Sequence, residues 1–325
     1  MRKTLHRLLA LTLLLAGALL APASFAAGQA HAKNVKITVL STMLADAGVG
    51  EWGFAALVEV DGYRILFDTG ARPQTVLENA KELKVDLSQV NEVILSHNHD
   101  DHTGGLLALR QALAAQNPQA LSRAHVGEGI FLPRHAPGMQ GEANTMLATR
   151  TAYEAGGGTF ELHQHADMIA PNVWLTGPVK RRYDEHNWFD DTTLATGHGD
   201  VVDNIPEDMS LVIDGPDGLI VVTGCGHAGI GNILAQTHEM FPHVRVKALV
   251  GGLHLLSADE ARLKWTAQRI KAAGVQYLLA AHCTGLEATY RLRALLGLTR
   301  KTAVVAAVGS SYSSSAGIDP LTIAK

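Results

Sequence analysis

The first half of the chain alternates short apolar runs with turn residues. Residues 35–40, 54–60 and 63–67 are apolar or β-branched, and Asp61-Gly62 between the last two runs is typical of a hairpin turn. Helical spacing over 75–83 follows Pro73, and the apolar run 92–95 predicts another buried strand. A further helix is expected over about 103–115. This half therefore predicts an antiparallel start followed by alternating strands and helices.

The second half repeats this alternation. The pattern predicts strands over 210–213, 219–223, 246–250, 277–280 and 303–305, and helices over 230–240, 258–273 and 286–296. Two such halves fit two sheets packed face to face with helices outside, which is an α/β four-layer αββα sandwich. No linker is long enough to separate two domains, so a single domain is expected over 27–325.

The segment 128–207 differs from the rest. It has three consecutive glycines at 156–158, several prolines and few clean periodicities. Long loops inside a compact domain are usually functional, so we predict that this insert determines the substrate. Arg181 and Arg182 are the expected substrate contacts, because cations beside aromatic residues suit a planar or anionic small molecule. The alternative is a surface excursion packed by its own aromatics, which here are Trp174, Tyr183, Trp188 and Phe189.

The N-terminus has the three parts of a secretory signal in order. Basic residues at 2, 3 and 7 precede an apolar run over 8–20, and the small residues Ala23-Ser24-Phe25-Ala26 follow. The run is shorter than the roughly 20 residues of a membrane span, so a cleaved signal peptide over 1–26 is expected rather than a stable membrane anchor. The location would be the periplasm or the exterior. Cleavage moves the formal net charge from −4 to −7, because three basic residues are lost. An acidic protein is a poor partner for nucleic acid, and a small-molecule substrate is expected instead.

A cluster of polar residues comes directly after the strand expected at 92–95. His97 and His99 are two apart, so an extended segment points them to one side, and Asp101 and His102 follow as the chain turns. Imidazoles with a carboxylate are the ligands expected for zinc, iron or manganese. Burial without a cation would cost several kcal/mol of unpaired desolvation. The sequence therefore predicts a metal site here rather than a solvated polar loop.

The pattern His-x-His-x-Asp-His, preceded by Phe67-Asp68-Thr69-Gly70, resembles the metallo-β-lactamase superfamily. Four later segments are similar in order and spacing to its branch of dihydropterin ribofuranosyl-aminobenzene phosphate synthase-like proteins. They are Asp208-Met209-Ser210-Leu211-Val212-Ile213, Thr223-Gly224-Cys225-Gly226-His227-Ala228-Gly229, Gly251-Gly252-Leu253-His254-Leu255 and His282-Cys283-Thr284-Gly285. The resemblance covers most of 35–310. It implies the αββα fold with metals at the edge between the two sheets.

The resemblance also implies a ligand set for two divalent metal ions, with zinc ahead of iron or manganese. His97 and His99 would hold one ion, completed by His227, while Asp101 and His102 would hold the second, completed by His282. Better-known members have a bridging acid where this chain has Cys225. Three alternatives follow for the bridging ligand: Cys225 contributes a thiolate, His227 replaces the acid, or one metal binds more weakly than the other.

Residues beside these ligands have expected roles as well. Asp68 is expected either to hold the histidine loop through hydrogen bonds or only to begin a turn. Asp101 and His254 are the expected catalytic residues, His254 as a ligand or as a hydrogen-bond donor to substrate. Cys225 and Cys283 could pair in an oxidising compartment, but free or ligating thiols are favoured beside ligand histidines. None of the remaining histidines at 125, 163, 165, 186 and 198 is preferred as a site residue.

These expectations combine into one function. A metal pair would make hydroxide available at neutral pH, so we expect an exported hydrolase that uses metal-bound hydroxide on a small ester, lactone, thioester or phosphoester. A pterin-pathway-like synthase is the alternative that the branch implies, although export argues against it. A third alternative is a non-catalytic, metal-containing protein that binds a ligand. The sequence leaves the oligomeric state open.

Overall fold

The computed structural model of the protein describes residues 31–196 and 199–324. The signal peptide expected over 1–26 lies outside these described residues. Within them, no helix has both the length and the apolar character needed to cross a membrane.

The first large sheet is built mainly from the N-terminal half. Its strands are antiparallel from one edge as far as β4, and parallel from β4 through β5 and β6 to β8 at the other edge. In spatial order they are β20 (Gly317–Asp319), β19 (Ser311–Ser313), β1 (Val35–Ser41), β3 (Ala55–Val60), β4 (Tyr63–Phe67), β5 (Glu92–Leu95), β6 (Arg123–Gly127) and β8 (Thr159–His163).

The second large sheet comes mainly from the C-terminal half. Strands β14 to β17 run parallel, and the hairpin partners β13, β10 and β9 are antiparallel. The order is β17 (Ala303–Val305), β16 (Tyr277–Ala280), β15 (Val246–Gly251), β14 (Gly218–Thr223), β13 (Leu211–Gly215), β10 (Val173–Leu175) and β9 (Asp167–Ala170). Two small sheets join β12 (Gly199–Val202), β11 (Thr193–Thr196) and β7 (Arg134–His135), and β18 (Ala307–Val308) with β2 (Leu44–Ala45).

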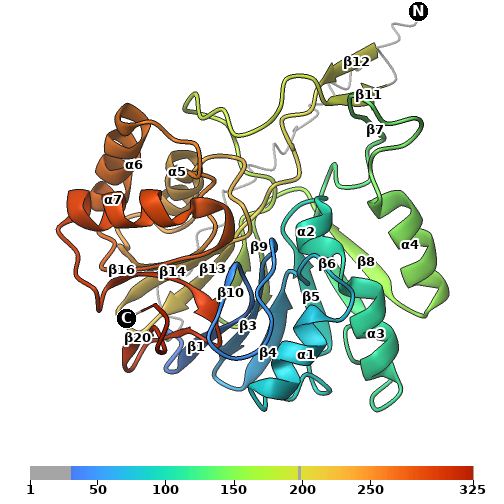
Figure 1. Cartoon of the computed structure of the whole chain (residues 1–325), viewed down its shortest axis with the longest axis horizontal. Coiled ribbons are helices and arrows are strands. Elements are labelled where there is room, and N and C mark those ends of the chain that lie inside the picture. Colours follow the sequence, from blue (N-terminus) through green and yellow to red (C-terminus); the bar gives the residue numbers. More distant parts are fainter. Residues whose placement is uncertain (1–30, 197–198, 325) are drawn as a thin grey trace, which may run out of the picture. The chain divides into compact units, whose positions relative to one another are not determined.

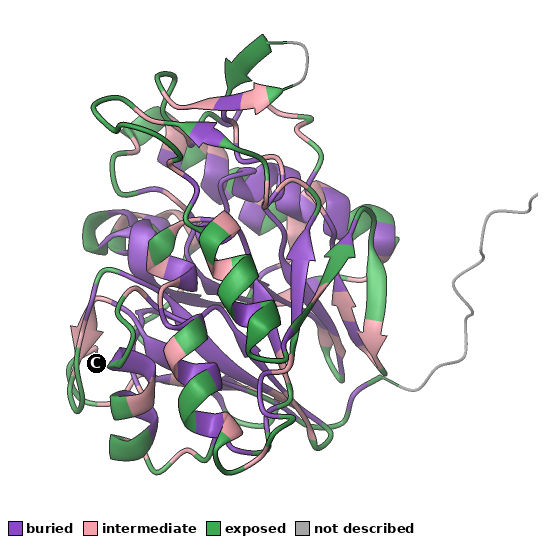
Figure 2. Ribbon diagram, turned by 90° about the vertical axis from the view of Figure 1, so that its right-hand side faces the viewer, coloured by how far each residue is buried: buried purple, intermediate pink, exposed green. Residues whose placement is uncertain are grey.

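Helices cover the outer faces of both large sheets (Figure 1). Helices α1 (Thr75–Glu82), α3 (Leu106–Ala114) and α4 (Met146–Ala155) share a core with the first sheet, through residues such as Val76 and Leu109. Helices α5 (Ile230–Met240), α6 (Glu260–Ala273) and α7 (Leu286–Leu296) share another with the second sheet. A third core lies between the sheets, and Figure 2 shows the buried strands beneath helices whose outer faces are exposed. The αββα sandwich is therefore confirmed.

The structure adds detail to two expected segments. The helix expected over 103–115 corresponds to α3, and a separate short helix, α2 (Asp100–Thr103), precedes it, with a break at 104–105 between them. Gly104 and Gly105 lie at the break, where a Cβ would come within 2.1 Å of the carbonyl oxygen of Ala71 and 2.2 Å of that of Thr69. The segment 128–207 contributes α4, β8, β9 and β10 to the scaffold in addition to its loops.

Candidate metal centre

Several strands end at the same edge of the sandwich, and each delivers a polar residue there. Asp68 follows β4, the segment 97–102 follows β5, His227 follows β14, and His254 follows β15. After β16, His282 begins the short 3₁₀ helix η1 (His282–Thr284). Asp68, His254 and His282 have left-handed φ values of 57°, 49° and 47°. Such conformations are costly for residues other than glycine and are often found at functional sites.

The side chains form two adjacent groups of donor atoms. In one group, donor atoms of His97, His99 and His227 all lie within 4.8 Å of one another. The other group consists of Asp101, His102, Cys225 and His282. In it, Nε2 of His282 lies 3.0 Å from Oδ2 of Asp101, and Nε2 of His102 lies 3.0 Å from Sγ of Cys225. The structure thus brings together the six expected ligands in the two sets that the resemblance implied, with Cys225 in the second.

Hydrogen bonds on the outer side of the rings orient three of these histidines. Nδ1 of His102 lies 2.7 Å from Oδ2 of Asp68, and Nδ1 of His227 lies 2.6 Å from the carbonyl oxygen of Asn187. Nδ1 of His97 lies 2.9 Å from Oγ of Ser96. A proton on Nδ1 leaves the lone pair of Nε2 free for a ligand. Among the described residues, Nε2 of both His97 and His227 is buried without a hydrogen-bond partner, so the donor set fits a divalent metal.

Asp68 holds the histidine loop in place. Besides His102, its carboxylate accepts hydrogen bonds from the backbone nitrogen of Ser96 at 2.7 Å and from its hydroxyl at 2.8 Å. Gly224 packs against this pair, since a Cβ at that position would lie 2.0 Å from Oγ of Ser96. These contacts favour the positioning role over that of a turn residue alone.

The electrostatics of the donors suit a cation. Burial lowers the pKa of His97 and His227 well below its usual value, and that of His99 to about 4, so these imidazoles are neutral at pH 7 as metal ligands must be. Burial also disfavours a charged His102, but the carboxylates of Asp101 and Asp68 outweigh it and raise its pKa to about 9. Without metal, the second group therefore keeps a proton that a cation would displace.

Both cysteines lie at the site as free, buried thiols. Sγ of Cys283 donates a long hydrogen bond of 3.5 Å to the carbonyl oxygen of Cys225. With His254 the two thiols form a third group of possible metal donors. His254 also packs on His227, with ring centroids 4.4 Å apart, so it extends the site beyond the two principal groups.

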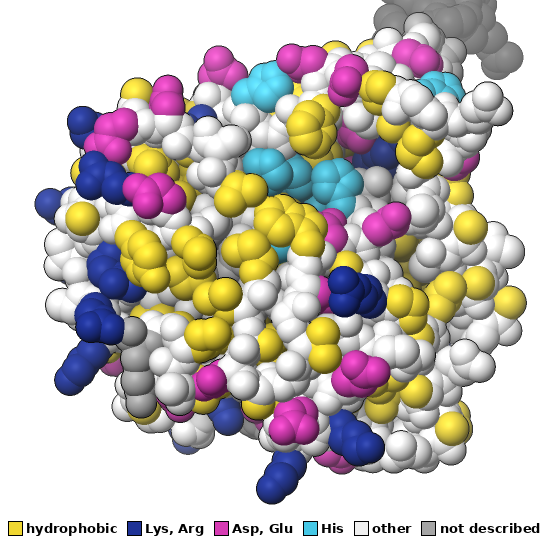
Figure 3. Space-filling model, viewed as in Figure 1, with side chains coloured by type: hydrophobic (Ala, Val, Ile, Leu, Met, Phe, Trp, Pro, Cys, Tyr) yellow, Lys and Arg dark blue, Asp and Glu magenta, His cyan; other side chains and the backbone are white. Residues whose placement is uncertain are grey.

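A cleft of about 1050 Å³ opens over these donors, and Figure 3 shows the histidines on this face among hydrophobic and acidic side chains. Part of the expected insert lines it, namely Ala143, Asp184, His186, Asn187, Trp188, Phe189, Thr192, Asp203 and Ile205. Trp52, Leu256 and Arg262 come from elsewhere in the chain. The insert therefore does contribute to the cleft, although much of it forms scaffold.

Arg181 and Arg182, the expected substrate contacts, do not line this cleft. The guanidinium of Arg181 donates to the backbone oxygens of Val179, Asn204 and Ile205, so it ties two loops together. Arg182 instead pairs with Glu239 on α5.

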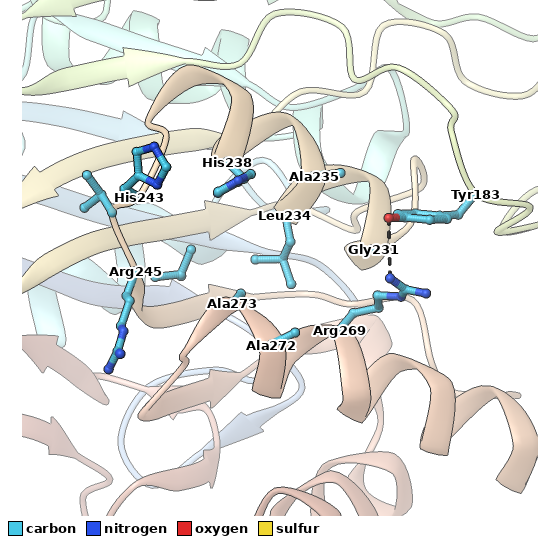
Figure 4. A pocket seen from close by; sticks show the side chains of 12 residues that line it. Tyr183, Gly231, Leu234, Ala235, His238, His243, Arg245, Arg269, Ala272 and Ala273 are labelled. Carbon is cyan, nitrogen blue, oxygen red and sulfur yellow. Dashed lines mark hydrogen bonds between the residues drawn. The ribbon is translucent and has the colours of Figure 1, made fainter.

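Two of the four aromatics expected beside the substrate also lie elsewhere. Trp174 packs edge-on against Phe241, with ring centroids 5.7 Å apart. Tyr183 lines a separate cavity of about 310 Å³ beside α5 and α6. There Nη1 of Arg269 donates to its hydroxyl at 3.4 Å (Figure 4). Trp188 and Phe189 remain as the aromatics of the insert that line the cleft.

The loop that carries Asn187 is anchored by residues that the sequence did not single out. The amide oxygen of Asn232 accepts from the backbone nitrogens of Arg182 and Tyr183, both at 2.7 Å. The buried carboxylate of Glu185 accepts from the backbone nitrogen of Asn232 at 2.9 Å. Because Asn187 orients His227 through a backbone carbonyl, no residue type could have revealed its role.

Comparison with known proteins agrees with this geometry. The sequence pattern of the Metallo-beta-lactamase superfamily matches residues 53–129, which include the first histidines. The 7,8-dihydropterin-6-methyl-4-(beta-D-ribofuranosyl)-aminobenzene-5'-phosphate synthase of Methanocaldococcus jannaschii is 30% identical over 78% of this chain and 89% of its own length. The chain belongs to the metallo-beta-lactamase superfamily.

Solved structures of the superfamily share the fold. A metal-dependent hydrolase of the beta-lactamase superfamily is 27% identical, with a TM-score of 0.67 over 81% of this chain and 93% of its own. Zn(2+)-bound PqqB from Methylobacterium extorquens is 12% identical, with a TM-score of 0.51 over 85% of this chain and 99% of its own. That second likeness shows the fold alone.

Proposed function

We propose that this protein is an exported dinuclear zinc hydrolase that acts on a small ester, lactone, thioester or phosphoester. The observation that supports this most directly is the pair of donor groups at one sheet edge beneath an open cleft. Buried nitrogens without partners would be costly in a site built for structure alone. A cleft above them leaves room for substrate and water, as a catalytic metal site requires.

Two bound divalent ions would lower the pKa of a shared water towards about 7 and so supply hydroxide at neutral pH. The chain's own part is to fix the geometry. Asp68, Ser96 and the carbonyl of Asn187 hold three imidazole rings in orientation. His254 lines the cleft beside His227 and is the residue placed to donate a hydrogen bond to substrate, while Asp101 contributes both a ligand oxygen and negative charge.

The walls of the cleft favour a planar substrate. The ring of Trp188 stacks on that of His186, with centroids 4.3 Å apart, and Phe189 is 77% exposed. Trp52 also lines the cleft, with its ring 4.6 Å from that of His282. Aromatic faces of this kind bind flat molecules at little entropic cost. Arg262 is the basic side chain of the lining; its Nη2 pairs with the buried Glu185 at 3.1 Å, and the exposed part of its guanidinium would meet an anionic substituent at the rim.

A synthase is the second candidate, and the observation in its favour is the 30% identity to a dihydropterin-pathway synthase of Methanocaldococcus jannaschii. The order of basic, apolar and small residues in 1–26 favours export instead, which would separate the protein from cytosolic intermediates. For that reason we propose hydrolysis, with the mature chain beginning near Ala27 in the periplasm or outside the cell.

The test uses protein purified from the periplasmic fraction, with intact mass and metal content measured first. We expect a mass lacking residues 1–26, two equivalents of zinc, and turnover of at least one generic ester, lactone, thioester or phosphodiester substrate. Chelation should abolish turnover, and zinc should restore it. Full metal loading without any turnover would contradict the hydrolase proposal, and a mass that retains residues 1–26 would contradict export.

A further inference from the structure

A second histidine cluster lies away from the cleft, on neighbouring strands at the edge of the first sheet. His125 is on β6, Glu161 and His163 are on β8, and the three strands β5, β6 and β8 are paired in register. We call these three residues the strand-edge cluster. None of them lines the cleft.

The donor atoms of the strand-edge cluster converge on one point. Nδ1 of His125 lies 3.0 Å from Nε2 of His163 and 3.7 Å from Oε2 of Glu161. Donors about 2.0–2.2 Å from a tetrahedral zinc would lie about 3.4 Å from one another, which falls between these two distances. Two imidazoles and a carboxylate form a donor set that zinc commonly takes.

Acidic side chains stand behind both rings. Nδ1 of His163 lies 3.4 Å from Oδ2 of Asp167, and Nε2 of His125 lies 3.7 Å from Oε2 of Glu92. Glu92 is itself held by the hydroxyl of Tyr63 and by Arg123. A carboxylate on the far nitrogen is the arrangement that fixes the tautomer of a metal-bound histidine.

Burial of both rings supports a bound cation. The side chains of His125 and His163 are only 2% and 3% exposed, and Nε2 of His125, on the side of the ring that faces Glu92, has no hydrogen-bond partner among the described residues. Two neutral imidazoles can share just one proton between their facing nitrogens, so the pair alone cannot satisfy every nitrogen. Burial and the neighbouring His125 also lower the pKa of His163, which keeps it neutral. Glu161 is 48% exposed at the outermost strand, so an ion could enter from solvent.

We propose that His125, Glu161 and His163 bind a zinc ion, separate from the metals of the cleft, with Asp167 and Glu92 orienting the two rings. Three protein ligands leave a fourth position for water at the exposed side of Glu161. The bound ion would fasten β8 to β6 at the edge of the sheet. Its role is to stabilise this edge, because the strand-edge cluster does not line the cleft over the other donors.

The experiment counts zinc in the mature protein after chelation and dialysis against buffered Zn²⁺. Glu161→Gln and His163→Gln should each bind one equivalent fewer than wild type, or bind that equivalent more than about tenfold more weakly. Glu154→Gln is the matched control, because it makes the same change at 46% exposure on α4 and should bind as wild type does. Circular dichroism confirms folding, and Glu161→Gln decides the matter if His163→Gln does not fold.

A second measurement separates this ion from those of the cleft. In a His97→Ala/His99→Ala/His102→Ala/His282→Ala variant, which removes ligands from both cleft groups, added Zn²⁺ should still raise the melting temperature, and Glu161→Gln in that background should remove most of the rise. Full zinc content in the cleft variant would contradict only the cleft assignment and leave this proposal standing. If Glu161→Gln and His163→Gln keep the zinc count and affinity of wild type, the strand-edge cluster is a hydrogen-bonded histidine pair only, and the proposal is overturned.

Discussion

The cleft and the strand-edge cluster use the same residue types in different settings. In the cleft, the donors stand on loops after strand ends, and His254 and His282 have left-handed φ values. In the strand-edge cluster, the donors stand on regular strands, and none of its three residues has a left-handed φ. The cleft donors face a space of about 1050 Å³, and the strand-edge cluster does not border it.

This difference bears on what each site can do. Loops can bring residues from β5, β14 and β16 to one point while leaving a side open for substrate. Neighbouring strands hold donors at fixed spacing, which suits an ion that stabilises and disfavours one that must exchange ligands during a reaction. A histidine cluster alone therefore does not indicate catalysis. A histidine cluster beside an open cleft does.

The largest effect is expected from removing a cleft ligand. His99→Ala or His102→Ala should lower zinc content and reduce kcat/KM by more than about 100-fold. Replacing a residue that only hydrogen-bonds to a metal ligand typically costs about 10–100-fold, and losing the ligand itself should cost more. Metal analysis and kinetics on the same samples measure this. His135→Ala is the matched control, since His135 is 56% exposed and pairs with Asp200 away from the cleft. Full zinc content in both ligand variants would contradict the ligand assignment.

A smaller effect is expected at Asp68, which acts through His102. Asp68→Asn keeps the size of the side chain but weakens the charge-assisted bond to Nδ1, so zinc affinity should fall about 10- to 100-fold. Titration with a competing zinc chelator measures the affinity. Asp214→Asn is the control. The carboxylate of Asp214 pairs with His31, and Asp214 does not line the cleft. Equal affinities in the two variants would reduce Asp68 to a turn residue.

Much of the scaffold could be predicted because its strands and helices have clear periodicities. The helices expected over 230–240 and 286–296 and the strand expected over 277–280 have the bounds that the structure gives. Four of the metal ligands lie in one short motif, and the others lie in glycine-containing segments. The resemblance to the superfamily could therefore assign all six to two metal positions. Short strands such as β6 and β8 lack a distinctive pattern, and without them the pairing of His125 with His163 could not be anticipated.

The misplaced residues have a common physical reason. Arg181 lies close to aromatic residues in the sequence. The direction in which its side chain points is set instead by the backbone carbonyls that the fold brings near, which belong to residues 179, 204 and 205. Likewise Asn187 acts through its backbone. Contacts of this kind depend on tertiary structure and not on residue type.

His254 tests whether the cleft contributes more than metal binding. If its ring donates a hydrogen bond to substrate, His254→Gln should lower kcat/KM about fivefold, the value of a hydrogen bond of about 1 kcal/mol. Zinc content should stay at the wild-type level, because His254 lies outside the two principal donor groups. Loss of zinc in this variant would instead make His254 a ligand, in the third group with Cys225 and Cys283.

The smallest effect is expected at Arg182. This residue is close in sequence to residues that line the cleft, but it does not line the cleft itself. Arg182 is 40% exposed and pairs with Glu239, and such surface pairs contribute at most about 1 kcal/mol. Arg182→Ala should therefore leave KM for an anionic substrate unchanged, whereas Arg262→Ala should raise it, because Arg262 lines the cleft. Nη2 of Arg262 also pairs with the buried Glu185 at 3.1 Å, so zinc content is measured in the same samples. Initial rates over a range of substrate concentrations separate KM from kcat. A raised KM in Arg182→Ala, with Arg262→Ala unaffected, would place the anion on the α5 side and move the substrate path away from the cleft rim.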